Sequence, residues 1–330
     1  MTARIKYRGG YSIGFPKKNF TISLETEFKF NGLKKDDDWI LNASVVDKTF
    51  LRNVINYKLF NSFDKNNIAP KTKYAEIFTN DNYYGFYVLT ERLDKSSLNL
   101  NDKSLIFKEP YVFRERDSRQ DSIARFLGNY YHQKLPKMED NRTVIDSLRS
   151  FIFYSSDSVF EKQVFKIFSK QNIIDWHILL LLANNGDGLM KNFVLYRKNG
   201  SCKFKIAPWD CDHSFGRDGD NKYNMLERVI DVKRNKLLKR LLENKNLNYN
   251  KALKNRWKKL RKKNIVDTEK LKGFIDSESE KIKPFVKRNF EKWPLDQWPH
   301  QDANGFEQEL DIIKEYIDLR IPQLDSLFFD

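Results

Sequence analysis

Cysteine and histidine are scarce in this chain, and their scarcity argues against several kinds of site. The 330 residues include two cysteines and four histidines. Cys202 and Cys211 cannot form a disulfide framework, and their spacing matches no zinc-binding pattern. The histidines have no metal-ligand spacing either, so we expect His177, which lies on an apolar stretch, to be a core residue. Nucleophilic catalysis by Cys211 is disfavoured because His213 is the only histidine near it and nothing evident orients that ring.

Long hydrophobic runs and a signal peptide are also absent. The longest apolar stretch, residues 173–183, contains Asp175 and His177, whereas a membrane span needs about 20 apolar residues. We therefore expect no membrane span. The N-terminal MTARIKYRGG lacks the apolar stretch and cleavage site of a secretory signal, which favours a cytoplasmic location. The chain opens inside what reads as a strand, so we expect a longer natural product whose leader or tether precedes Met1.

Positive charge is abundant, with a formal net charge of +15. Much of it lies between Val232 and Lys272, in runs of helical period whose apolar stripe is Leu237, Leu238, Leu241 and Leu242. Such a basic face suits nucleic acid, an anionic membrane surface or an acidic protein. No zinc finger, aromatic RNA-binding strand or recognition helix accompanies it, so we expect no specific nucleic-acid binding. A solvated helix face is the simplest interpretation, and an anionic partner is the alternative. The oligomeric state is not indicated.

The hydrophobic pattern predicts an α+β fold with a strand-rich part over residues 1–110 and a mainly helical part over residues 111–330. In the first part, residues 19–24 alternate as a strand, and residues 73–91 form a hairpin around the turn at 80–82. Residues 47–63 have helical period, with Asp47 as the expected N-cap. The first part is thus a small sheet with one helix packed against it.

In the second part, helical patterns cover residues 121–131, 142–153, 158–168 and 171–183. One lone hairpin, formed by residues 193–197 and 203–207, interrupts the helices, and the chain is helical from there to its end. This layout is typical of a two-lobed, kinase-like fold, in which the strand-rich lobe binds the nucleotide.

The residues best suited to chemistry flank this hairpin, in NNGDGLMKN and PWDCDHSFG. Asp187 and Asn192 have the D-x-x-x-x-N spacing of a protein-kinase catalytic loop, and the hairpin returns the chain to Asp210 and Asp212. Phosphoryl transfer needs a carboxylate to orient the attacking hydroxyl, and Mg²⁺ takes a few hard oxygen ligands. We predict Asp187 as the catalytic residue and Asn192, Asp210 and Asp212 as the metal ligands. The alternative is that Asp187 and Asp210 only cap loops.

A glycine-rich segment near the N-terminus is a second candidate. Arg8-Gly9-Gly10 and Gly14 precede Lys17 and Lys18. Glycines let the backbone turn tightly and approach a phosphate, and the lysines can pair with that phosphate. An ordinary glycine turn is the alternative. Lys18 would need a carboxylate partner, and Glu91 and Glu76 are the two candidates. The sequence does not choose between them, because a slip of one residue in register reverses the direction of every side chain of a strand.

Four blocks of this sequence resemble the CotH-type atypical protein kinases, a family first associated with bacterial spore coats. The blocks cover residues 4–94 and 184–216, and they are RGGYSIGFPKKNFTISL, DDDWILNASVVDKTFLRN, YAEIFTNDNYYGFYVLTERLD and NNGDGLMKNFVLY with APWDCDHSFG. The tail, with NFEKWP and residues 320–327, fits the family more loosely. Residues 111–170 match nothing in the family pattern and are a candidate insertion. One departure is the second glycine of RGG, where many members carry asparagine.

The resemblance implies a kinase-like two-lobed fold that uses Mg²⁺, or Mn²⁺, to transfer the γ-phosphate of ATP to a protein serine. It implies Lys18 as the phosphate-contacting lysine, with Lys17 second, and Glu91 as its partner. It also implies phosphate-binding or structural roles for Arg8 and Arg52. The basic charge favours an acidic or anionic acceptor protein. With a missing leader, the location would be the spore coat or the cell surface.

Two other functions remain open from the sequence. The same scaffold could move AMP or activate a carboxylate, because function depends on the site and not on the fold. Alternatively, the protein could be a non-catalytic scaffold that binds anionic partners through its basic helices. The complete set of Asp187, Asn192, Asp210 and Asp212 argues against the scaffold.

Overall fold

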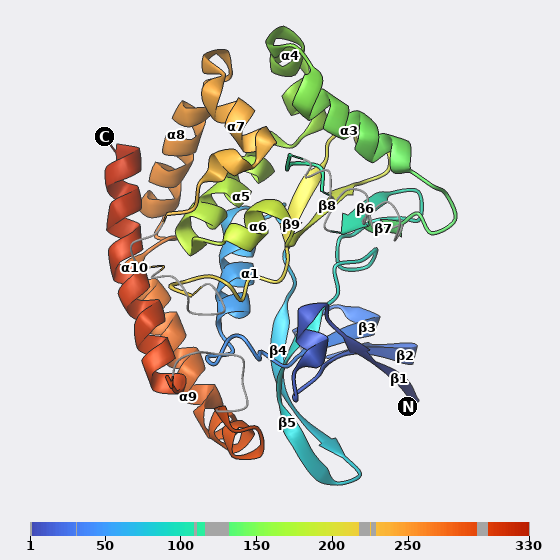
Figure 1. Ribbon diagram of the computed structural model, residues 1–330, viewed down its shortest axis with the longest axis vertical. Helices are drawn as coiled ribbons and strands as arrows, with labels where there is room; N and C mark the ends of the chain where they lie inside the picture. The colour runs from blue at the N-terminus through green and yellow to red at the C-terminus, as the bar shows by residue number, and fades with distance from the viewer. Residues whose placement is uncertain are drawn as a thin grey trace.

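Two antiparallel sheets and nine α-helices make up the described residues of this mixed α+β protein (Figure 1). The computed structural model describes residues 2–30, 32–108, 111–115, 132–217, 225, 229–295 and 303–329. The first sheet has the order β1-β2-β3-β5-β4, and a short 3-10 helix, η1 (Tyr11–Gly14), joins its first two strands. The strands are β1 (Ala3–Arg8), β2 (Asn19–Lys29), β3 (Lys35–Asn42), β4 (Thr72–Thr79) and β5 (Asn82–Glu91). The predicted strand at 19–24 and the hairpin at 73–91 are therefore confirmed.

The strand register decides which side chains of this sheet face the candidate site. Thr21 pairs with Ile40, and Ile40 pairs with Thr90, so these three residues share one face because side chains alternate along a strand. The other face carries Trp39 and Leu41, which pack in a separate buried cluster. A residue such as Glu91, next to Thr90, must therefore point away from the face that carries Thr21.

Helix α1 (Arg52–Phe63) begins five residues later than the sequence predicts. Phe50 has φ 59°, a left-handed conformation that an α-helix cannot contain. Asp47 is not the N-cap of α1: its carboxylate accepts hydrogen bonds from the backbone N–H groups of Thr49 (3.1 Å) and Arg52 (2.8 Å), so it closes the turn that leads into the helix.

The predicted hairpin of the second part is present, but it is not alone. Strands β8 (Phe193–Arg197) and β9 (Lys205–Pro208) belong to a four-stranded sheet of order β7-β6-β8-β9. Its other strands are β6 (Leu105–Lys108) and β7 (His132–Leu135). Both are short, and β6 pairs with a strand almost ninety residues further along the chain, a partner that a local pattern does not reveal. The expectation of a lone hairpin was wrong.

The helices surround α5 (Lys170–Ala183), which is buried from Asn172 to its end. In Figure 1 the long helices α9 and α10 run along one side of the molecule, and α3 and α4 lie at the end farthest from the first sheet. The predicted helix at 121–131 lies outside the described residues. Across the described part of the chain, no helix combines the length and apolarity that crossing a membrane requires. The remaining helices are α3 (Arg142–Tyr154), α4 (Asp157–Ile167), α6 (Gly186–Met190), α7 (Lys236–Glu243), α8 (Tyr249–Lys262), α9 (Thr268–Lys292) and α10 (Phe306–Phe329), with short 3-10 turns η2 (Val232–Arg234) and η3 (Lys245–Leu247).

His177 on α5 is a core residue, as the sequence predicts, and it makes stability depend on pH. Its Nδ1 lies 3.1 Å from the hydroxyl of Tyr249, and burial lowers its pKa from 6.5 to about 3. Below pH 6.5 the unfolded chain binds a proton that the folded chain refuses, so the free energy of unfolding falls as the pH falls toward 3. We expect His177 to contribute a slope of up to about 1.4 kcal/mol per pH unit.

Urea unfolding of the wild type and of His177→Gln at a series of pH values below 6.5 measures this contribution. Glutamine keeps a polar group near Tyr249 and does not titrate. We expect a shallower loss of stability in the variant, and equal slopes would contradict the assignment.

Candidate active site

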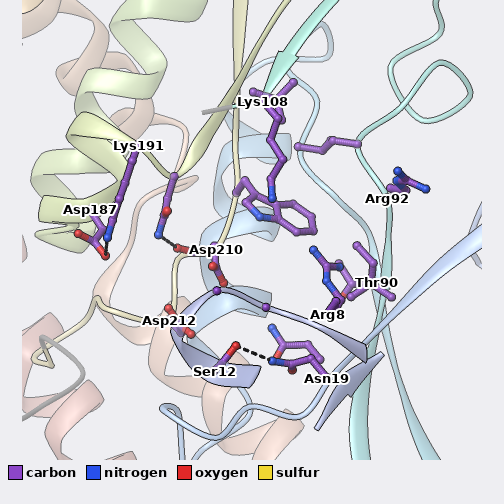
Figure 2. A pocket seen from close by; sticks show the side chains of 18 of the residues that line it. Arg8, Ser12, Asn19, Thr90, Arg92, Lys108, Asp187, Lys191, Asp210 and Asp212 are labelled. Atoms are coloured by element: carbon purple, nitrogen blue, oxygen red, sulfur yellow. Dashed lines mark hydrogen bonds and ion pairs between the residues drawn. The ribbon is translucent and has the colours of Figure 1, made fainter. Parts of the chain in front are cut away.

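A cavity of about 650 Å³ lies between the two sheets, and side chains from both line it (Figure 2). The first sheet contributes residues of β1, β2, β3 and β5, and the second contributes residues of β6, β7 and β8. Asp187, Asn192, Asp210 and Asp212, all predicted from the sequence, line it together. Of the side chains predicted to bind phosphate or its lysine, only Arg8 lines the cavity, together with Gly9 and Gly10 of the glycine-rich segment.

Asp187 is positioned by the short helix α6. Asn185 caps this helix, since its side-chain oxygen accepts a hydrogen bond of 2.7 Å from the N–H of Gly188. The Asp187 carboxylate forms an ion pair of 3.1 Å with Lys191, one helical turn further on, and lies 3.8 Å from Nδ1 of His213. Two side chains thus hold a partly exposed carboxylate at the cavity wall.

The base of the β8–β9 hairpin brings Asn192 to Asp210. The backbone N–H of Trp209 donates to the carbonyl oxygen of Asn192 (3.1 Å), and the Asn192 side-chain amide donates to the carbonyl oxygen of Asp210 (2.8 Å). The amide nitrogen of Asn192 is therefore engaged, and its side-chain oxygen is the atom left to act as a ligand. The prediction that the hairpin returns the chain to Asp210 is confirmed.

Helix α1 holds the turn that carries the two aspartates after β9. Asp210 has φ 52°, and its N–H donates to the hydroxyl of Tyr57 (3.1 Å). The N–H of Cys211 donates to the side-chain oxygen of Asn53 (2.7 Å). Cys211 itself is buried, and burial raises the pKa of its thiol well above the usual value. This thiol is a poor nucleophile, as expected from the sequence.

Burial and the neighbouring carboxylates raise the proton affinity of Asp212. Burial, followed by the negative charges of Asp210, Asp47 and Asp187, raises the pKa of Asp212 well above its ordinary value. Asp212 is a partly buried residue that lines the cavity, so a bound cation could offset this repulsion directly.

These residues suit a magnesium ion that also binds phosphate. Within the described residues, no group of three or more histidine, cysteine, aspartate or glutamate side chains is arranged as a metal site. The described residues therefore do not form a complete protein cage around a metal ion. Asp210, Asp212 and the amide oxygen of Asn192 offer a few hard oxygen ligands, and Mg²⁺ typically completes such a set with water and phosphate oxygens.

Cationic side chains lie across the cavity from the carboxylates (Figure 2). Arg8 at the end of β1 and Lys108 at the end of β6 both lie over the indole of Trp209, at 5.3 and 5.4 Å from its ring centroid. Arg92 follows β5 and forms an ion pair with Asp38. Sequence reasoning missed Arg92 and Lys108. Thr90 and Arg92 flank the predicted Glu91, so the correct register of β5 would have found Arg92.

Lys17 and Lys18, for which the resemblance implies a phosphate-binding role, do not line the cavity. Lys17 is buried under the first sheet, where its ammonium group donates to the carbonyl oxygens of Ala43 (2.9 Å) and Phe86. Burial lowers the pKa of Lys17 well below its ordinary value. The ammonium group of Lys18 donates to the carbonyl oxygen of Ile13 (2.8 Å). Both lysines hold local structure.

Glu91 also lies outside the cavity lining and does not pair with Lys18. Its two carboxylate oxygens accept hydrogen bonds from the backbone N–H groups of Lys34 (2.8 Å) and Lys71 (3.0 Å). It therefore joins two chain segments that flank the sheet. The register explains this, because Glu91 faces the side of the sheet that carries Trp39.

The resemblance allows Arg52 either a phosphate-binding or a structural role, and the contacts of Arg52 are structural. Its side chain is fully buried and forms ion pairs with Asp47 (2.8 Å) and Glu309 (3.0 Å). Its Nε also donates to the carbonyl oxygen of Ser214 (3.0 Å), just after the aspartate turn. Arg52 thus ties α1 and α10 to the segment that carries Asp210 and Asp212, without lining the cavity.

Comparison with known proteins agrees with the resemblance seen in the sequence. The chain matches the CotH family model, described as CotH kinase protein, over residues 5–323. It is 25% identical to the Inner spore coat protein H of Bacillus subtilis (strain 168) over 323 residues, which are 95% of this chain and 83% of that protein. The match includes every residue that lines the cavity, and the chain belongs to the CotH kinase protein family.

Proposed function

We propose that this protein binds Mg²⁺ and ATP in the cavity and transfers the γ-phosphate to the hydroxyl of a protein serine. One observation carries the proposal: a cluster of carboxylates, Asp187, Asp210 and Asp212, lines the same cavity as Arg8 and Lys108. A nucleotide triphosphate with its metal ion has matching chemistry, because its anionic oxygens suit the cations and its metal suits the carboxylates.

Asp210 and Asp212 would hold the metal ion, with Asn192 as a third oxygen ligand. Mn²⁺ suits the same oxygen ligands. When bound, the ion neutralises charge on the phosphate oxygens and so favours transfer of the phosphoryl group. The hydrogen bonds from Asp210 to Tyr57 and from Cys211 to Asn53 keep the turn in place. Preorganisation of this kind lowers the reorganisation that the reaction requires.

Asp187 would orient the serine hydroxyl and accept its proton. The ion pair with Lys191 holds the carboxylate in one orientation, and Lys191 also lines the cavity, within reach of a transferred phosphate. Arg8 and Lys108 would contact phosphate oxygens. In this proposal, Arg8 and Lys108 have the role that the resemblance implied for Lys17 and Lys18.

We also propose that the arrangement is kinase-like and two-lobed. A turn with Gly9 and Gly10 between β1 and β2, and a helix between β3 and β4, support this. One departure is clear: β3 contributes Ile40 and Asn42 to the cavity, where a protein kinase uses a lysine of its third strand.

The relative is named an inner spore coat protein. We therefore also propose that this protein is located at the spore coat.

ATP labelled separately at the γ- and α-phosphates, with magnesium and an acidic serine-containing acceptor protein, tests the reaction. We expect γ-label in the acceptor. Transfer of α-label would point to AMP transfer, and release of pyrophosphate or phosphate without labelled acceptor would point to carboxylate activation. Without any transfer or nucleotide-induced thermal shift, the non-catalytic scaffold would be favoured.

Two single substitutions test the revised assignment of the cations. Arg8→Gln removes a cation that lines the cavity, whereas Lys18→Gln removes one that does not. We expect Arg8→Gln to raise KM for ATP about tenfold, the size of a lost charge-assisted hydrogen bond, and Lys18→Gln to leave it within about twofold. The reverse order would restore Lys18 as the phosphate ligand.

A further inference from the structure

Strand β1 is an exposed edge of the first sheet, next to the proposed active site. It pairs with β2 on one side, and no strand in the described part of the chain pairs with its other side. The chain from Ala3 to Tyr7 is exposed, and Arg8 at its end lines the cavity. In Figure 1 the strand lies at the outer end of the sheet, beside the N-terminus. An edge strand presents unpaired N–H and C=O groups to a partner.

The register shows which backbone groups are available. The carbonyl oxygen of Thr2 accepts a hydrogen bond of 3.3 Å from the N–H of Glu25. The pairing of β1 with β2 continues from there without a shift in register to the pair of Arg8 and Asn19. Hydrogen-bonded pairs alternate along an antiparallel ladder. The backbone groups of Arg4 and Lys6 therefore face β2, and those of Ile5 and Tyr7 face outward.

The side chains of β1 form one apolar row and one basic row. Ile5 and Tyr7 are 61% and 64% exposed, although each stands opposite an apolar residue of β2. Arg4 and Lys6 are exposed on the other face, the one that continues to Arg8 and the cavity. No carboxylate of the described residues forms an ion pair with Arg4 or Lys6 within 4.0 Å.

The opposite edge of the sheet, β4, does not offer the same features. Glu76 of β4 forms an ion pair of 3.4 Å with Arg288 of α9, and the same arginine lies over the ring of Phe78. No residue of β4 lines the cavity. Of the two edge strands, only β1 both presents outward-facing backbone groups and ends at a residue that lines the proposed site of phosphoryl transfer.

We propose that the outer edge of β1 docks the acceptor polypeptide, which adds to the first sheet as a further strand; this rests on the function proposed above. The docked segment is extended and alternates acidic side chains, over Arg4 and Lys6, with apolar side chains, over Ile5 and Tyr7. Strand addition supplies affinity through the backbone and specificity through alternate side chains. The segment continues past Arg8 and brings its serine to Asp187.

Proline scanning of the edge tests the docking. Ile5→Pro removes an outward N–H without removing a bond to β2, and proline is tolerated on an edge strand. Ile5→Ala is the matched control, since it removes the same side chain and keeps the N–H. The acceptor is a synthetic peptide in which glutamate alternates with valine on both sides of one serine, and a scrambled peptide of the same composition is its control.

We expect Ile5→Pro to raise KM for the alternating peptide about threefold to tenfold above that of Ile5→Ala, the effect of one lost backbone hydrogen bond. KM for ATP should be the same in both variants, which also shows that both are folded. Equal KM values for the peptide in the two variants, or equal use of the scrambled peptide by the wild type, would overturn the proposal.

Amide hydrogen exchange of the wild type tests the docking without any catalysis. We expect the alternating peptide to slow exchange at the amides of Ile5 and Tyr7 and to leave that of Lys6, which already faces β2, unchanged. Absence of this protection would overturn the docking proposal whatever the enzyme does. If no label is transferred to any acceptor but the protection appears, docking stands and the proposed phosphoryl transfer fails.

Discussion

Asp210→Asn is expected to lower the rate of phosphoryl transfer about 10³-fold or more. The substitution removes the charge that would hold the metal ion, and the charge stabilisation that such an ion supplies is worth several kcal/mol at the transition state. Asparagine has nearly the same shape, so the hydrogen bond from the residue's N–H to Tyr57 should persist. Single-turnover rates at saturating ATP, measured over a range of magnesium concentrations, give the effect.

The control for Asp210→Asn is Asp102→Asn. Asp102 is an exposed aspartate whose ion pair with Lys95 lies at the surface, where such pairs contribute little. We expect its rate and magnesium dependence to match those of the wild type. Asp187→Asn should lower the rate by about 10²-fold to 10⁴-fold, the usual effect of a general base, with an unchanged magnesium dependence. A rate for Asp210→Asn within about tenfold of the wild type would contradict the metal site.

Arg52→Met is expected to lower the free energy of unfolding by about 3–5 kcal/mol. The substitution leaves Asp47 and Glu309 buried beside the vacated site, and an uncompensated buried charge has an effect of this size. Glu309 keeps its ion pair with Arg217 (2.6 Å), so the loss should lie toward the lower end of that range. Urea unfolding followed by circular dichroism measures it.

The control for Arg52→Met is Arg142→Met, which breaks an exposed ion pair with Asp140 and should change stability by less than about 0.5 kcal/mol. If Arg52→Met does not fold, Arg52→Lys, which keeps the charge and loses the fork of hydrogen bonds, provides the measurement. A variant that unfolds like the wild type but binds ATP more weakly would return Arg52 to the nucleotide site.

Asn192 and the turn that follows β9 show how much of the site depends on short-range sequence. Asp187 lies in the short helix α6, and Asn192 follows two residues after that helix ends. The turn Lys198-Asn199-Gly200 closes a hairpin between Asn192 and Asp210. Spacing and turn residues act over a few bonds, so the sequence predicted that these residues would meet. The helices at 142–153, 158–168 and 171–183 were confirmed for the same reason, because each has its own period and needs no distant partner to be recognised.

The glycine-rich segment shows where local pattern stops being informative. Gly9 has φ 127°, so the expected tight turn is present, but the direction of each following lysine depends on what packs around it. Lys17 points under the sheet because its ammonium group there donates to two carbonyl oxygens and lies over two aromatic rings. None of these partners is adjacent in sequence, so a pattern could not distinguish this lysine from one that faces a phosphate.

By itself, the sequence determined the α+β class, the main strands and helices, and the acidic half of the site, because these depend on periodicity, turn chemistry and spacing over a few residues. In the cationic half, Arg8 was named from the sequence, and only the tertiary structure added Lys108 and Arg92. Lys108 reaches the cavity because β6 pairs with β8, and Arg92 does so because the register of β5 turns Glu91 away. Strand pairing and register are set by contacts between distant segments, and a shift of one residue reverses which side chain faces the cavity.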